Sequence, residues 1–122
     1  MEWEFILHKE EKYLEVVTRG IADNEGSLNM AKAIAKEMRH NRVTRALIDH
    51  RKIDEVSGKM FEIYDRPKIF KLIGMILGIK IAEVINPRHF DHFSFLESAS
   101  VNQGIKFSIF LERKKALEWL FM

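Results

Sequence analysis

A run of charged and hydroxyl side chains, DHRKIDEVSGK, is where this sequence could carry chemistry. The run directly follows the apolar residues ALI, so it begins where a buried strand is expected to end. In open α/β sheets, ligands and reacting groups usually lie at the carboxyl ends of the strands. The run therefore supplies a candidate binding loop, whose residues are Asp49, Arg51, Asp54, Glu55, Ser57 and Lys59.

Ser57 has two compatible interpretations. It precedes a run with helical apolar spacing, so its hydroxyl can cap the helix by accepting a hydrogen bond from a backbone N–H, which contributes about 1 kcal/mol. A helix N-terminus also favours a phosphate dianion, which makes Ser57 a candidate phosphoacceptor that Lys59 could assist. The sequence leaves both interpretations open.

Acid–base chemistry at Asp49 and His50 is a third interpretation of this run. Adjacent residues of a strand point to opposite faces, so these two side chains are poorly placed to touch. A relay that includes Ser57 would also need a nucleophile elbow such as Gly-x-Ser-x-Gly, which the sequence lacks. We therefore assign no catalytic residue and predict that the protein is not an enzyme.

His89 and His92 are three residues apart in a predicted helix, so they share a face, with Asp91 between them in sequence. A zinc site normally has three or four ligands, and this spacing matches no known signature. We predict solvated histidines at the start of the helix, no metal and no other cofactor.

The elements that position these residues follow from apolar periodicity and turn signals. Strands are expected at residues 2–8, 13–19, 43–49, 79–85 and 105–111. Helices are expected at residues 24–40, 57–77 with a break at Pro67, 88–102 and 113–121. The third of these helices is expected to turn inward Phe90, Phe93, Leu96 and Val101. The order ββαβαβαβα predicts an α/β fold, a single mixed, mostly parallel five-stranded sheet with helices packed on it.

Length and composition limit the class of protein. A chain of 122 residues fits one domain, residues 1–122. The absence of cysteine excludes disulfides and fits a cytoplasmic location. A net charge of +2, with Lys and Arg spread among the acids, predicts no nucleic-acid partner. The most apolar run, residues 69–85, contains Lys71, Lys80 and Glu83, so no transmembrane segment is expected.

Residues 60–77 hold more apolar side chains than one face of a surface helix requires. We expect an exposed apolar patch here that serves a homodimer, a protein partner or a lipid-like ligand. The predicted patch consists of Phe61, Ile69, Phe70, Ile73 and Ile76.

Three segments in order resemble the STAS-like, SpoIIAA-like family of anti-sigma factor antagonists and their divergent relatives. They are ALIDHRKIDEVSG, KIAEVINP and the closing FSIFLERKKALEWL. In the antagonists, a serine in the loop after the third strand is phosphorylated by a partner kinase. Here only Ser57 and Gly58 match that loop, and Lys59 stands where an apolar residue is usual, so the resemblance is to the divergent branch.

The resemblance covers nearly the whole chain and implies a non-enzymatic regulatory or protein-interaction module. Its partner would bind the loop from Lys52 to Lys59 and the helix that follows. The alternative is a carrier or sensor of a small hydrophobic, lipid-like ligand, because some folds of similar layout hold lipids between a helix and the sheet.

Overall fold

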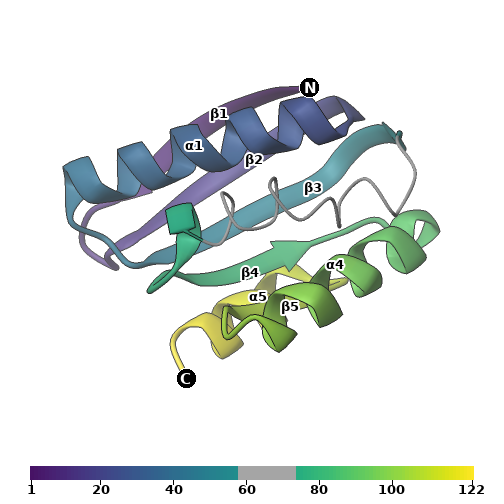
Figure 1. Ribbon diagram of the computed structural model, residues 1–122. Helices are drawn as coiled ribbons and strands as arrows, with labels where there is room; N and C mark the ends of the chain where they lie inside the picture. Colours follow the sequence, from purple (N-terminus) through teal and green to yellow (C-terminus); the bar gives the residue numbers. More distant parts are fainter. Residues whose placement is uncertain (58–73) are drawn as a thin grey trace.

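Five strands form one mixed sheet in the computed structural model, which describes residues 1–57 and 74–122 (Figure 1). They are β1 Glu2–His8, β2 Tyr13–Ala22, β3 Arg45–Val56, β4 Lys80–Val84 and β5 Lys106–Phe110. Their order across the sheet is β1-β2-β3-β4-β5; β1 is antiparallel to β2, and every other neighbouring pair is parallel. The predicted α/β fold with a single, mostly parallel sheet is therefore confirmed.

Helices cover both faces of this sheet. The described helices are α1 Asn24–Asn41, the short 3-10 turn η1 Pro87–His89, α4 Phe90–Asn102 and α5 Arg113–Leu120. Figure 1 shows α1 and α4 in front of the sheet and α5 behind it. Most of the helix predicted between Ser57 and Leu77, with its break at Pro67, lies outside the described residues.

The start and end of α1 follow local rules. The Asp23 side chain caps the helix, with its Oδ1 accepting a hydrogen bond from the Gly26 backbone N–H at 2.6 Å. A Cβ atom at Gly26 would lie 2.7 Å from that oxygen, so glycine is the residue that leaves the cap room. The helix ends where Arg42 takes a left-handed conformation, with φ of 56°.

Alternation along the strands divides the core between the two faces. In β3, Ala46 and Ile48 pack on the face that α1 and α4 cover, whereas Leu47 packs against α5. In α4, Phe93 is buried and Leu96 packs on the core as expected, but Phe90 and Val101 are 48% and 52% exposed. The inward positions predicted for Phe90 and Val101 are therefore wrong, and the buried face of α4 is narrower than expected.

The third strand runs beyond the point where its sequence pattern suggested an end. We predicted a strand to Asp49 and a loop from Lys52, but β3 continues to Val56 and pairs with β2 as far as Ala22. Ile53 in this extension is fully buried. Two register shifts interrupt the pairing, so the extension does not alternate regularly, which is why it reads as a loop.

Candidate functional site

Three polar side chains from neighbouring strands meet on the face covered by α1 and α4. Thr18 lies on β2, His50 on β3 and Glu83 on β4. The Thr18 hydroxyl is 2.7 Å from His50 Nδ1, and Glu83 Oε2 is 3.0 Å from His50 Nε2. All three are buried, with exposed fractions of 0%, 3% and 3%. This polar row is defined by Thr18, His50 and Glu83.

A register shift brings the row together. Val17 pairs with Asp49 and Arg19 with Lys52, so Thr18 alone stands opposite both His50 and Arg51. Such bulges redirect side chains and are common beside functional sites. The His50 ring also stacks on Phe93 of α4, with centroids 4.9 Å apart and planes 18° apart, which holds the imidazole flat between the sheet and the helix.

With Glu83 ionised, two arrangements of protons satisfy these contacts. With a neutral ring, the Thr18 hydroxyl donates to Nδ1 and the proton on Nε2 goes to the Glu83 carboxylate. With a protonated ring, Nδ1 donates to the Thr18 oxygen, and that hydroxyl turns to the Asp49 carbonyl at 3.2 Å. In both states Nε2 donates to Glu83 Oε2.

A hydroxyl, an imidazole and a carboxylate in a row have the connectivity of a nucleophilic triad. The Thr18 hydroxyl, however, has no exposed surface, and Thr18 is not among the residues that line the adjoining pocket. A nucleophile must reach its substrate. The row therefore provides a polar floor beneath a pocket and does not present an attacking group.

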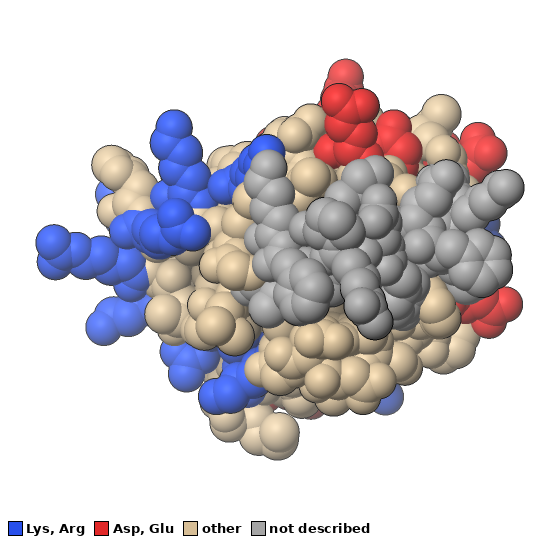
Figure 2. Space-filling model, in the orientation of Figure 1, with Lys and Arg blue, Asp and Glu red and all other residues tan. Residues whose placement is uncertain are grey.

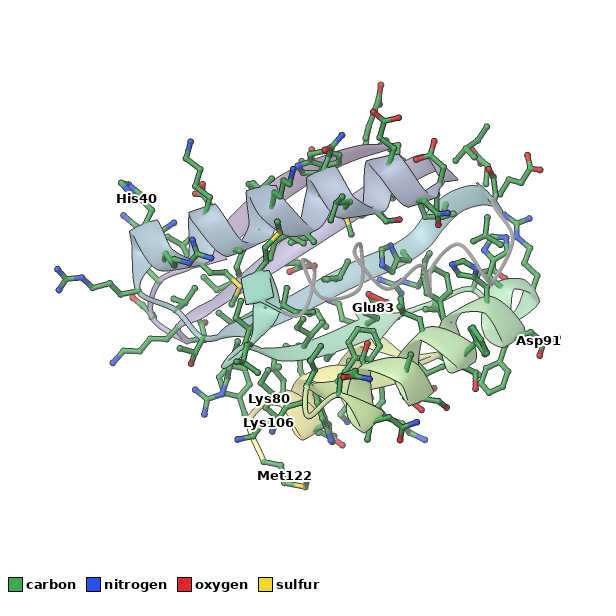
Figure 3. All side chains as sticks on the ribbon, in the orientation of Figure 1. His40, Lys80, Glu83, Asp91, Lys106 and Met122 are labelled. Atoms are coloured by element: carbon green, nitrogen blue, oxygen red, sulfur yellow. The ribbon has the colours of Figure 1, made fainter. Side chains whose placement is uncertain are left out.

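The pocket is a cavity of about 120 Å³ between the sheet, α1 and α4. Its walls are mainly apolar side chains, among them Met30, Ala31, Ile34, Ile81, Phe93 and Leu96. Its polar residues include His50, Glu83, His92 and Ser57. Figure 3 shows the Glu83 carboxylate in front of the sheet, between α1 and α4. An apolar cavity with a few converging polar groups is the usual form of a small-molecule site.

The second oxygen of Glu83, Oε1, has no hydrogen-bond partner among the described residues. Leaving a buried polar atom unpaired costs about 1–3 kcal/mol, and more for a charged group. Glu83 stands between the buried apolar residues Ala82 and Val84 in the strand KIAEV. That isolated acid in a buried parallel strand is the sequence signal that could have identified the site, together with Thr18 in β2.

The predicted solvation of His89 and His92 is wrong. His89 is buried, and His92 is half-buried with its ring edge-on to Phe93 at 4.9 Å. Burial lowers the pKa of both imidazoles below the ordinary histidine value. No group of three or more His, Asp or Glu residues suited to a metal ion occurs within 1–57 and 74–122.

The predicted binding loop is divided between the two faces of the sheet and its edge. Asp49 turns toward the α5 face and holds Arg51, with its Oδ2 2.8 Å from Arg51 Nη2. Asp54 and Glu55 are exposed on the extension of β3. The predicted loop is therefore largely strand, because β2 pairs with β3 up to Val56.

Ser57 directly follows the last residue of β3. Its backbone N–H donates to the Ala22 carbonyl at 2.7 Å, and the half-buried residue lines the pocket. Its predicted role as a helix cap or phosphoacceptor stays a prediction, because the helix that would follow lies outside the described residues.

Most of the predicted apolar patch also falls outside the described part of the chain. Ile76 is described and is 6% exposed, packed in the core of the α1 and α4 face, so it is not part of an exposed surface. The predicted residues that the structure does not describe are Lys59, Phe61, Ile69, Phe70 and Ile73.

The α5 face carries a separate charged network around Glu15. Its Oε1 is 2.8 Å from Arg113 Nη2 and 2.9 Å from His8 Nε2, and Arg113 also reaches the Tyr13 hydroxyl at 3.3 Å. Burial raises the pKa of Glu15, but the hydrogen bonds and charges of Arg113 and His8 together outweigh it, so the pKa is lowered.

Replacement of Arg113 by methionine is expected to change how stability depends on acid. Because the Glu15 pKa is lowered in the folded state, the stability it provides is present above pH 4.5 and is lost as the pH falls through the folded value. The variant should be less stable at neutral pH and lose less on acidification. Urea unfolding measured at pH values from about 3 to about 7 tests this. Lys115→Met, on an exposed pair of the same helix, is the control and should follow the wild type.

The strand order and the helix placement define a STAS-like, SpoIIAA-like fold, and solved structures share it. A DUF3478-family protein with a SpoIIAA-like fold from Shewanella loihica PV-4, described as uncharacterized, is 20% identical; the match covers 98% of this chain and 92% of that one, with a TM-score of 0.53. The unphosphorylated anti-sigma factor antagonist SpoIIAA is 9% identical, with 96% and 94% covered and a TM-score of 0.54.

Comparisons at the level of sequence give nothing further: no family model and no curated protein matches the chain. The likeness in structure confirms the predicted SpoIIAA-like fold. Within the described residues, no helix combines the length and apolar character needed to cross a membrane.

Proposed function

We propose that this protein is a non-enzymatic cytoplasmic module that binds a small apolar ligand in the pocket between the sheet, α1 and α4. The observation that carries the proposal is the cavity itself, about 120 Å³ with mainly apolar walls and a buried polar floor of His50 and Glu83. A mainly apolar pocket with a small number of polar groups is the usual form of a site for a small molecule. The ligand would make the module a carrier or a sensor.

The geometry of the polar row argues for binding over catalysis. The Thr18 hydroxyl is enclosed, and His50 is held by Thr18, Glu83 and the Phe93 ring at once. Side chains locked by several contacts form a rigid lining, which lowers the entropy lost on binding. The floor of the pocket is thus preorganised for one orientation of a ligand.

A protein-interaction module is the second candidate, and a surface observation favours it. Figure 2 shows Lys and Arg gathered at one end of the visible face, with Asp and Glu mainly toward the other side. Separated charges of this kind steer partners and fix their orientation. SpoIIAA, which shares the fold, is an anti-sigma factor antagonist. The extension of β3, with exposed Asp54 and Glu55, would offer the contact surface.

Binding of 4-ethyltoluene, a one-ring apolar probe, tests the ligand proposal. We expect saturable binding in ligand-observed NMR, and co-purified small molecules in native mass spectrometry of fresh protein. Ala31→Leu places extra methyl groups at the pocket wall and should weaken probe binding about tenfold, in line with the cost of overpacking.

Lys36→Leu is the matched control, because it adds the same side chain at an exposed position of α1. It should bind the probe like the wild type. Absence of probe binding to the wild type, or equal binding by Ala31→Leu, would contradict the ligand proposal. Purified protein that carries no co-purified small molecule and binds a defined protein partner in solution would favour the interaction module.

A further inference from the structure

Glu83 Oε1, which has no hydrogen-bond partner among the described residues, indicates which chemical group a ligand would place in the pocket. We propose that the ligand carries a hydrogen-bond donor, a hydroxyl or N–H group, and places it on Glu83 Oε1. This inference rests on the proposed function and adds the polar group that the ligand must have. Glu83 is 3% exposed and lines the pocket, and Oε1 has no partner within the described residues.

The row specifies a donor on the ligand, not an acceptor. With Glu83 ionised, its Oε2 accepts the proton of His50 Nε2 in both arrangements of Thr18 and His50. An ionised carboxylate can only accept hydrogen bonds, so Oε1, which has no partner among the described residues, is an available acceptor at the floor of the pocket. A donor placed there makes a hydrogen bond to a charged group, which is stronger than one between neutral groups.

The size of the cavity limits the rest of the ligand. An engineered apolar cavity of about 150 Å³ in another protein holds benzene, and this one is about 120 Å³. Because the pocket is not fully enclosed, the apolar body that suits it is one ring with short substituents or a short branched chain. The Phe93 ring, stacked on His50, provides a flat wall beside the acceptor, which suits a planar body.

A matched pair of probes tests the inference on the wild-type protein. The probes are 4-ethylphenol and 4-ethyltoluene, which differ by a hydroxyl in place of a methyl group of similar size. We expect the phenol to bind about tenfold more tightly, as a hydrogen bond to a charged acceptor implies. Titration followed by ligand-observed NMR gives the two dissociation constants.

Glu83→Met provides the matched variant, because methionine has similar length and no acceptor oxygen. It should lose the preference for 4-ethylphenol while keeping or improving its affinity for 4-ethyltoluene. If the wild type binds both probes equally, or prefers the hydrocarbon, the inference is overturned and the apolar site stands. If neither probe binds the wild type, the proposed function fails and the inference fails with it.

Discussion

Replacement of His50 by leucine is expected to lower the free energy of unfolding by about 1–3 kcal/mol, the usual cost of leaving a buried polar group without its hydrogen-bond partner. The change removes the partner of Glu83 Oε2, whose carboxylate is 3% exposed and already lacks a partner at Oε1 among the described residues. Thr18 stays satisfied, because its hydroxyl can donate to the Asp49 carbonyl. Urea unfolding followed by circular dichroism measures the loss.

The double variant His50→Leu with Glu83→Met distinguishes two causes of the lost stability: the loss of packing by the His50 ring and the loss of the hydrogen-bond partner of Glu83. Replacing both members of a buried pair with apolar residues of similar volume is often neutral or stabilising. We expect the double variant to recover most of the stability that His50→Leu loses. If the double variant is as unstable as the single one, then packing against Phe93, and not the Glu83 charge, accounts for the loss.

Replacement of Leu120 by alanine is the second change with a large expected effect. Leu120 is fully buried where α5 packs on the sheet, beside Ala116 and Leu47. Truncating a buried leucine to alanine removes about 2–5 kcal/mol, since the lost transfer energy is joined by the cost of a cavity. Thermal and urea unfolding of the variant measure the effect.

Leu111→Ala is the control for this change. Leu111 lies just before α5 and is 53% exposed, so the same truncation there should alter stability by no more than about 0.5 kcal/mol. Equal losses from both variants would contradict the role of Leu120 as the residue that anchors α5. The binding of apolar probes on the other face of the sheet should be unchanged in Leu120→Ala if the variant remains folded.

The order of the elements could be predicted because its signals are local. The alternation in β1, the Asp23 cap of α1 and the Asn86-Pro87 pair after β4 each depend on a few neighbouring residues, and the elements they bound lie close to the expected ranges. The length of β3 could not be predicted in this way. It depends on the partner strand β2, whose pairing continues to Ala22 through two register shifts.

The candidate site shows the same division. Alternation correctly separates Asp49 from His50, since Asp49 bonds Arg51 while His50 contacts Thr18 and Glu83. The partners of His50 are more than thirty positions away in sequence, so no local spacing reveals them. The burial of His89 and His92 likewise depends on how α4 lies against the sheet.

The consecutive strand order has a consequence for how the chain can be made. Within residues 1–57 and 74–122, each strand pairs with the one synthesised just before it, and no described strand is inserted between two earlier ones. A nascent chain leaving the ribosome can therefore extend the sheet one strand at a time, with β5 added at its rim and α5 closing over the rear. Domains generally begin to fold from the N-terminal side during translation, and this topology never requires an insertion between strands that have already joined.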